Sequence, residues 1–245
     1  MAIYRGNDGD NRYNGTAIAD LIYGRSGDDT LSGGGGNDTI DGGEGNDQIR
    51  GGSGNNVLIG GEGNDRIWAD GGNDRINAGE GNDLVHAGGG HNHIVLGEGN
   101  DASVSLGGND SISGGEGNDT IRCGAGNDRL WGGEGDDVLV AEAGNDILSA
   151  GEGNDILNGG AGNDVMSGGE GDDRFIFNAG WDRIVDFDDD DDRIDVSAFA
   201  GFTSFATVRN ALSQVGEDVV LRAGTHRLVI EDTRLRDLDS DDFIW

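Results

Sequence analysis

Aspartate residues recur along most of this chain at multiples of nine residues, and each one closes a glycine-rich hexapeptide. Carboxylate and backbone carbonyl oxygens are the ligands that Ca²⁺ prefers, and the ion takes about six to eight of them. Because glycine lets a tight turn expose its carbonyls, a turn that ends in aspartate has the ligand types for calcium. The predicted carboxylate ligands are Asp29, Asp38, Asp47, Asp65, Asp74, Asp83, Asp101, Asp110, Asp119, Asp128, Asp137, Asp146, Asp155, Asp164 and Asp173.

Glycines that lie four and two residues before these aspartates are the predicted carbonyl donors. They are clearest in the copies that keep glycine at both places. The implied cofactor is Ca²⁺, bound as many ions along the chain. The predicted carbonyl ligands are Gly43, Gly45, Gly61, Gly63, Gly115, Gly117, Gly133, Gly135, Gly160, Gly162, Gly169 and Gly171.

The turns belong to a nine-residue repeat that fills residues 6–176 without an insertion or a deletion. Its nineteen copies follow the pattern G-G-x-G-[N/D]-D-x-U-x, in which U is a large apolar residue. A flexible Gly/Asp-rich linker is the alternative interpretation, but low-complexity sequence would not keep its phase over nineteen copies. The repeat therefore predicts a solenoid of stacked coils.

The last three residues of each copy predict a short β-strand. Successive side chains of a strand point to opposite faces, so the large residue at position eight points inward. After Leu31, only Ser103 interrupts this apolar column. Stacked about 4.8 Å apart, the column forms a thin continuous core. The chain has no proline, so every residue keeps a backbone donor for the strand ladder.

An eighteen-residue period is superimposed on the nine-residue one. Position three is glutamate in every other copy and a small residue in the copies between, so one coil contains two nonapeptides that turn at opposite edges. Two interpretations of these glutamates stay open: solvated turn tips, or a ridge that binds calcium or a cationic partner. The glutamates are Glu44, Glu62, Glu80, Glu98, Glu116, Glu134, Glu152 and Glu170.

The two edges of the predicted roll differ in how well the aspartates are kept. On the edge that carries the glutamates, here named the Glu edge, every turn from Asp29 to Asp173 ends in aspartate. On the opposite edge, Asn56 and Asn92 replace the aspartate. Counted over both edges, twelve pairs of successive turns have aspartate in both members. We predict that the opposite edge binds calcium more weakly.

Composition indicates a fold that depends on cations. The 245 residues carry a formal net charge of −32, which self-repulsion makes hard to compact unless bound cations neutralise it. A pI near 4.1 argues against nucleic acid as a partner. The single cysteine, Cys123, has no partner for an intramolecular disulfide. We expect neither an N-terminal signal peptide nor a membrane span, because no suitable apolar run is present.

Periodicity ends at Phe177, and residues 177–245 predict a cap that covers the open end of the solenoid. Residues 181–187 and 193–196 alternate like strands, and residues 188–192 between them form an acidic loop, either solvated or a further calcium site. Helical spacing of Phe205, Val208, Leu212 and Val215 predicts one helix. Residues 217–222 and 226–231 predict a β-hairpin. Residues 1–5 form a lead-in to the roll.

The repeats closely resemble those of the RTX (repeats-in-toxin) hemolysin-type calcium-binding proteins. The stretches 180–187 and 192–199 also resemble the G-x-D-x-I-x-D-F and D-x-I-D-x-S-x-F motifs of serralysin-type C-terminal regions. The resemblance implies an all-β, parallel β-roll with one calcium column along each edge. It also implies that Asp242-Phe243-Ile244-Trp245 ends an uncleaved signal read by a type I secretion apparatus, so that the protein is secreted and extracellular.

No catalytic constellation emerges from the sequence. The H-E-x-x-H helix of the proteases and the G-x-S-x-G elbow of the lipases are missing, and only residues 1–5 precede the repeats, so we expect no enzyme. His91 and His93, with His86 nearby, indicate a degraded calcium turn or a weak zinc or copper site. Outward Trp68 and Trp131 are either isolated surface residues or sugar-binding aromatics.

The sequence therefore predicts a secreted, monomeric calcium-binding β-roll with a small β-rich cap carrying one helix. It folds on binding Ca²⁺ outside the cell and acts without catalysis, at a cell surface or in a matrix. The alternative is an extracellular polysaccharide-binding module resembling those of alginate epimerases. A hydrolase or lyase is a third class, for which no residues qualify.

Overall fold

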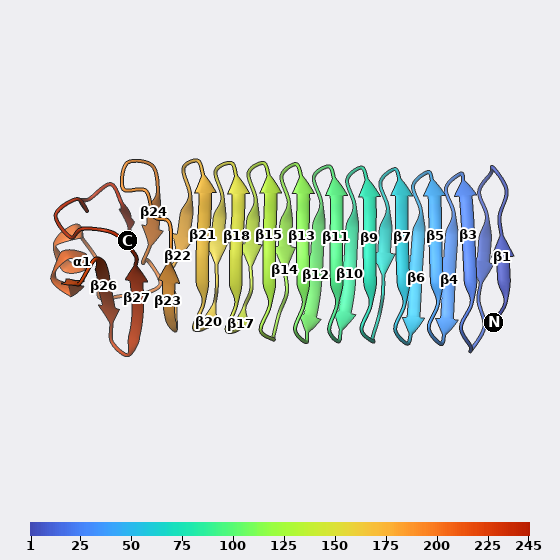
Figure 1. Cartoon of the computed structure of the whole chain (residues 1–245), viewed down its shortest axis with the longest axis horizontal. Helices are drawn as coiled ribbons and strands as arrows, with labels where there is room; N and C mark the ends of the chain where they lie inside the picture. The colour runs from blue at the N-terminus through green and yellow to red at the C-terminus, as the bar shows by residue number, and fades with distance from the viewer.

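The computed structural model describes all 245 residues as one elongated β-roll with a small cap at its C-terminal end (Figure 1). Along the roll the long strands alternate between two sheets that lie face to face, and within each sheet a strand of one coil pairs in parallel with the equivalent strand of the next coil. This order is that of a solenoid whose coil contains two strands and two turns. The predicted all-β, parallel β-roll is confirmed.

The first sheet has fourteen strands and contains those that lead into the Glu edge. In spatial order they are β1 (Ile3–Arg5), β3 (Leu21–Ser26), β5 (Thr39–Glu44), β7 (Val57–Glu62), β9 (Arg75–Glu80), β11 (His93–Glu98), β13 (Ser111–Glu116), β15 (Arg129–Glu134), β18 (Ile147–Glu152), β21 (Val165–Glu170), β23 (Trp181–Ile184), β27 (His226–Ile230), β26 (Asp218–Ala223) and β25 (Leu212–Val215).

The second sheet has twelve strands and leads into the opposite edge. In spatial order they are β2 (Arg12–Asn14), β4 (Thr30–Gly35), β6 (Gln48–Ser53), β8 (Arg66–Trp68), β10 (Leu84–Gly89), β12 (Ala102–Gly107), β14 (Thr120–Arg122), β16 (Val138–Val140), β19 (Ile156–Asn158), β22 (Arg174–Ile176), β24 (Arg193–Asp195) and β28 (Phe243–Ile244). A two-stranded sheet, β17 (Ala143–Gly144) with β20 (Ala161–Gly162), lies along the same edge.

Strand register confirms the eighteen-residue coil. Along nearly all of the roll each residue pairs with the residue eighteen positions later, as Ile40 does with Leu58 and Glu44 with Glu62. Most strands have six residues rather than the three predicted, because they continue through positions one to three of the next copy. Position one, which the sequence pattern places in the turn, is therefore a strand position whose side chain points inward.

Position eight forms the apolar core, as predicted. Its side chains from Ile22 to Phe175 are buried, and Ser103 is the one polar member. Position one supplies a second inward column, made of glycine or of buried residues such as Ala78, Leu96 and Cys123. Where position one is glycine, its small volume leaves room inside the turn, next to the aspartate.

Each end of the roll is closed by residues of this chain. At the N-terminal end, β1 pairs with β3, and the rings of Tyr4 and Tyr13 stack with their centroids 4.1 Å apart. At the C-terminal end, β23 and β24 continue both sheets and the predicted hairpin forms from β26 and β27. The lead-in and the cap are thus part of the same stack of strands.

The helix is shorter than predicted. It begins after the cap residue Ser204 and spans only α1 (Phe205–Ala211). Leu212 and Val215, expected in the helix, lie in β25, which pairs antiparallel with β26. Tertiary strand pairing has overridden the helical spacing of these apolar residues. No helix here has the length and apolar character needed to cross a membrane.

Candidate metal centres in the turns

One oxygen of each aspartate at position six joins neighbouring coils. The backbone N–H of Asp29 donates to Oδ1 of Asp47 over 2.7 Å, and Asp47 donates in the same way to Oδ1 of Asp65 over 2.7 Å. The pattern continues along both edges. Eighteen-residue spacing puts the carboxylate beside the backbone of the previous coil, so the aspartates are held inside the turns.

The other oxygen, Oδ2, is buried and has no hydrogen-bond partner in most turns, which makes it an orphaned oxygen. Leaving such an oxygen unpaired inside a protein is costly, and an ionised carboxylate costs far more than a neutral group. Fourteen of the fifteen predicted aspartates show this feature. They are Asp29, Asp38, Asp47, Asp65, Asp74, Asp83, Asp101, Asp119, Asp128, Asp137, Asp146, Asp155, Asp164 and Asp173.

The glycine at position one creates the space that Oδ2 faces. A Cβ added to Gly42 would lie 2.1 Å from Oδ2 of Asp47 and 2.6 Å from the carbonyl oxygen of Gly60, in the next coil. At Gly114 the corresponding distances are 2.2 Å to Asp119 and 2.5 Å to the carbonyl of Gly132. Oxygens from two coils thus converge on one small space, and oxygen donors of these two kinds suit calcium.

Burial raises the pKa of these carboxyls, to about 6 for Asp47 and to about 7 for Asp65 and Asp119. Desolvation is the main cause, and the carboxylates of neighbouring coils raise the pKa further, while the backbone N–H on Oδ1 lowers it. A divalent cation beside Oδ2 would act in the opposite sense by favouring the ionised form. The donor set, the orphaned oxygen and the space therefore fit a calcium ion.

Asp110 is the one predicted aspartate that departs from this arrangement. The hydroxyl of Ser105 donates to its Oδ2 and the N–H of Asn92 donates to its Oδ1, so neither oxygen is free. Ser105 occupies position one, where most turns of this edge have glycine or alanine. Asp110 therefore differs from the other predicted aspartates, because both of its oxygens already accept hydrogen bonds.

Both aspartate columns extend one coil beyond the repeats. Oδ1 of Asp182 accepts the N–H of Asp164 over 3.1 Å, and Oδ1 of Asp192 accepts the N–H of Asp173 over 2.9 Å. Asp182 could have been found, since it lies eighteen residues after Asp164. Asp192 lies nineteen residues after Asp173, so an inserted residue hid it. Its Oδ2 accepts the N–H of Asp188, which ties the acidic loop to the roll.

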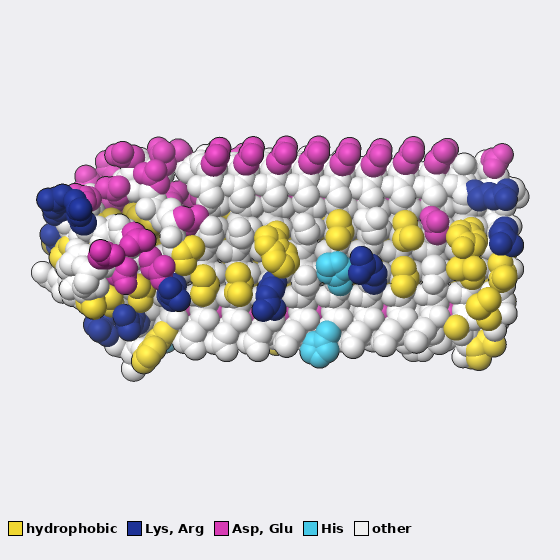
Figure 2. Space-filling view, viewed as in Figure 1, with side chains coloured by type: hydrophobic (Ala, Val, Ile, Leu, Met, Phe, Trp, Pro, Cys, Tyr) yellow, Lys and Arg dark blue, Asp and Glu magenta, His cyan; other side chains and the backbone are white.

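The glutamates of position three lie outside the turns. They pair in register from coil to coil and form a regular acidic row along one edge (Figure 2). Their side chains are exposed, whereas the orphaned oxygens of the aspartates face the interior. The glutamate row and the candidate calcium sites are therefore separate features of the Glu edge.

The histidines do not form a metal cluster. Nδ1 of His91 accepts the N–H of Asn109 over 2.7 Å, and His91 donates its own N–H to Oδ1 of Asn73. His91 thus takes the place that asparagine has at position five of neighbouring turns, and His93 lies on the outer face of β11. Nowhere do three His, Cys, Asp or Glu side chains converge. In the turns, most ligands would have to be carbonyls.

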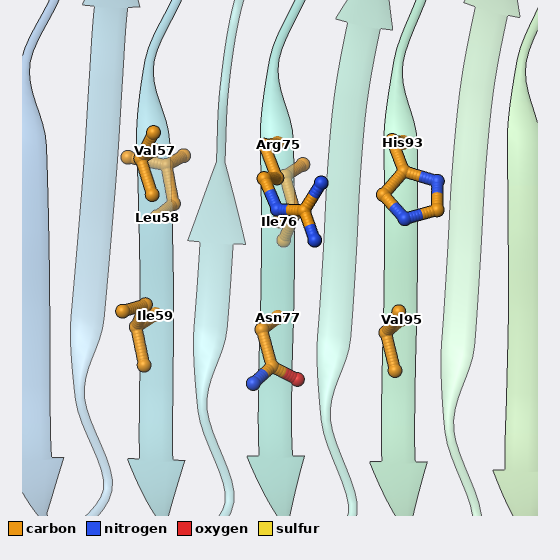
Figure 3. Close-up of a pocket in the computed structure, with 8 residues that line it drawn as sticks. All are labelled: Val57, Leu58, Ile59, Arg75, Ile76, Asn77, His93 and Val95. Carbon is orange, nitrogen blue, oxygen red and sulfur yellow. The ribbon is translucent and has the colours of Figure 1, made fainter.

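The outer face of the first sheet has one shallow depression, of about 240 Å³, across β7, β9 and β11 (Figure 3). Val57, Ile59, Arg75, His93 and Val95 contribute side chains to it, and no carboxylate, hydroxyl or thiol does. General acid–base or nucleophilic catalysis needs paired polar groups at hydrogen-bond distance, and histidine is the most frequent base. Nδ1 of His93 lies 3.4 Å from Oγ of Ser111, and no carboxylate lines the depression to orient this pair.

Comparison with known proteins agrees with this geometry. The family model of the RTX calcium-binding nonapeptide repeat matches residues 5–40, 41–76, 68–102, 105–139, 119–148, 140–175 and 149–184. No curated protein sequence matches the chain.

Three solved structures are similar in part. The extracellular lipase LipA from Serratia marcescens is 19% identical with a TM-score of 0.39, over 85% of this chain and 40% of the lipase. The AlgE6R3 subunit of the Azotobacter vinelandii mannuronan C5-epimerase is 27% identical with a TM-score of 0.36, over 57% of this chain and 78% of that one. A hyperactive, Ca²⁺-dependent β-helical antifreeze protein from an Antarctic bacterium is 19% identical with a TM-score of 0.39, over 92% and 95%. The chain spans about two fifths of the lipase.

Proposed function

Because the chain belongs to the family of RTX calcium-binding nonapeptide-repeat proteins, we propose that it is a secreted, non-catalytic protein that folds by binding many Ca²⁺ ions outside the cell. The observation that carries this proposal is the set of fourteen buried carboxylate oxygens without partners. At neutral pH these charges face one another across successive coils, so the roll without cations is opposed by desolvation and repulsion. Calcium supplies the neutralising charge and accepts the converging oxygens as ligands.

Each ion would be held by residues of two successive turns on one edge. Oδ2 of the aspartate and the carbonyl of position one in the next coil already converge, as Asp47 and Gly60 show. The carbonyls of positions two and four, represented by Gly43 and Gly45, complete the proposed set. Eight successive pairs of turns on the Glu edge and two on the opposite edge have orphaned oxygens in both members. The expected number of complete sites is therefore ten rather than twelve.

Secretion in the unfolded state follows from the same energetics. Low calcium inside a cell leaves the carboxylates without ligands, and calcium outside the cell then folds the chain, since metal binding supplies folding free energy. The end of the chain resembles a type I secretion signal, and in the folded protein Asp242 and Phe243 are buried. A secretion apparatus that reads this segment would need the unfolded chain.

Circular dichroism tests the proposal on the full chain. We expect a disordered spectrum in chelator, strand content after addition of Ca²⁺, and no equivalent change with Mg²⁺, which is smaller and demands stricter octahedral geometry. A chain that is fully folded in chelator at pH 7.5 would contradict the proposal.

A second candidate function is binding of an acidic extracellular polysaccharide, supported by the outer face of the twelve-stranded sheet. No strand of that sheet from β2 to β22 contains an acidic residue, although the whole chain has a charge of −32. Arg12, Arg50, Arg66 and Arg122 are exposed there and form no ion pair. The guanidinium of Arg50 lies 5.5 Å from the ring centroid of Trp68.

Retention on immobilised alginate in the presence of calcium tests this candidate. We expect the variant Arg50→Gln/Arg66→Gln to lose retention, because the basic face attracts carboxylates. Arg75→Gln/Arg129→Gln on the other sheet is the matched control and should keep it. Equal retention by both variants would mean that this face is not the binding surface, and no retention of the parent protein would leave calcium binding as the whole function.

A further inference from the structure

We propose that five turns are closed to calcium by a side chain of their own, so that the ions form one continuous row on the Glu edge and a separate short row at the C-terminal end of the opposite edge. The identity of the ion rests on the function proposed above. The five turns are those whose position-six residue is not among the fourteen orphaned carboxylates. These residues are Asn11, Asp20, Asn56, Asn92 and Asp110.

Asn56 shows how a turn is closed. Its Oδ1 accepts the N–H of Asp38 over 3.0 Å, which fixes the orientation of the amide. Its Nδ2 then points into the turn and donates to the carbonyls of Gly54 over 3.2 Å and of Gly52 over 3.4 Å. The amide is 1% exposed. In this turn an N–H donor therefore lies where the aspartates of other turns have an unpaired oxygen.

The same arrangement recurs in the two other turns that end in asparagine. Nδ2 of Asn92 donates to the carbonyl of Gly90 over 3.3 Å, and Nδ2 of Asn11 donates to the carbonyl of Gly9. In all three turns the acceptor is the carbonyl of position four. These carbonyls thus face the position-six side chain. An amide satisfies them with its own N–H, whereas a carboxylate repels them and requires a cation between.

Hydroxyl groups close the remaining two turns. Ser105 donates to Oδ2 of Asp110. The backbone N–H and the hydroxyl of Thr16 donate to Oδ2 of Asp20 over 2.6 and 2.8 Å. Each bond satisfies an oxygen that is orphaned elsewhere, so a cation at these turns would have to displace a hydrogen bond already made.

The order of closed turns divides the opposite edge into two parts. From Asp20 to Asp110 the only open turns, meaning turns with an orphaned Oδ2, are those of Asp38 and Asp74, and each lies between two closed turns. From Asp128 to Asp164 all turns are open. Since each site uses oxygens of two successive turns, the first part lacks complete calcium sites and the second part has them.

The substitution Asn56→Asp tests the inference by gain of binding. It would join Asp38 and Asp74 into three successive open turns and so create two complete sites. We expect calcium-saturated Asn56→Asp to bind one or two ions more than the parent chain, counted by native mass spectrometry and by equilibrium dialysis with atomic absorption. Circular dichroism of the same samples verifies that the variant is folded.

Asn55→Asp is the matched control. Asn55 belongs to the same turn but is exposed, and its Oδ1 accepts the N–H of Asn73 over 2.8 Å. Asp28 does the same for Asn46, so an aspartate fits this place. The control adds the same charge outside the turn and should add no ion. No gain with Asn56→Asp, or an equal gain with both variants, would overturn the inference.

A second variant keeps the test decisive if Asn56→Asp does not fold. Ser105→Gly removes the hydroxyl that closes Asp110 and restores the residue most frequent at position one. It would extend the C-terminal row of the opposite edge by one turn, so we expect one additional ion. An unchanged count would overturn the inference. A parent chain that binds no calcium would instead contradict the proposed function, so the two failures are distinguishable.

Discussion

The two edges of the roll have the same backbone register but different interiors. On the Glu edge, nine successive turns from Asp29 to Asp173 leave an orphaned carboxylate oxygen, whereas on the opposite edge hydrogen bonds to amides and hydroxyls interrupt the series. One repeat thus supports two ways to stabilise a turn. The first needs an ion, and the second is complete within the protein. Four substitutions follow as tests of this difference.

Removing a carboxylate should be most damaging in the middle of the Glu edge. Asp119→Asn would interrupt the row where both neighbouring turns are open, so it removes ligands from two sites. If one ion is lost at a free calcium concentration about 100 times its Kd, the free energy of unfolding falls by about 2.7 kcal/mol. Thermal unfolding in calcium and counted ions measure the effect.

Asp74→Asn is the same change on the opposite edge, between the closed turns of Asn56 and Asn92. Here we expect no loss of ions and an unchanged or raised melting temperature. The new amide can donate to the carbonyl of position four, as Asn56 does to Gly54, and a buried unpaired charge is removed. If Asp74→Asn and Asp119→Asn were equally destabilising, the two edges would not differ as described.

Acidification should partly replace calcium, mainly on the Glu edge. Burial raises the pKa of Asp65, Asp83, Asp119 and Asp137 to about 7 in the folded roll, against an ordinary value of 3.8. The folded state therefore binds protons that the unfolded state has released. The resulting stability is full below about pH 4 and is lost as the pH rises through 7.

In chelator, we therefore expect strand content to increase as the pH falls from 7.5 to 4, with the steepest change between pH 7 and 5. Circular dichroism in a pH series measures this. With saturating calcium the carboxylates are ligands and the fold should be present at pH 7.5 already. A chelated chain whose spectrum does not change over this range would contradict the buried environment of these aspartates.

The sequence was sufficient to predict the coil, the core and the ligand types, because all three depend on periods. A strict eighteen-residue register places Glu44 beside Glu62 and Asp29 beside Asp47 without any further information. It was not sufficient to predict which turns are closed. Ser105 and Thr16 act through single hydrogen bonds whose geometry depends on local backbone, and no period marks them.

Position one illustrates a second limit. The glycine-rich hexapeptide was interpreted as a turn, yet its first residue is an inward strand position beside the aspartate of the same turn. The pattern of burial along the strand shows that position one points inward, whereas the presence of glycine in the sequence does not. The shortened helix has a similar cause, since the pairing of Leu212 with Leu221 involves residues distant from the helix itself.

Filling the space at position one should have a smaller effect than removing the carboxylate. Gly42→Ala would place a methyl group close to Oδ2 of Asp47 and the carbonyl of Gly60. The chain accepts alanine at the equivalent Ala78, so we expect a folded protein whose calcium midpoint rises severalfold. Gly51→Ala is the control on the opposite edge, at the closed turn of Asn56. There the added Cβ would lie 2.8 Å from Nδ2 of Asn56, and it would displace no ion. An equal shift in both variants would mean that the space is not a calcium site.

The exposed glutamates should matter least. Glu116 lies in register between Glu98 and Glu134, and like charges directly opposite one another on parallel strands repel. Glu116→Gln should therefore raise the melting temperature in calcium at low salt by no more than about 2 °C, and the difference should vanish in 1 M NaCl because the exposed charges are then screened. The number of bound ions should stay unchanged, since the orphaned oxygens of the turns lie inside the roll and the glutamates lie outside it. A loss of one or more ions from Glu116→Gln would instead show that the glutamate row is itself part of the calcium sites, and that the Glu edge differs from the opposite edge by its ligands as well as by its open turns.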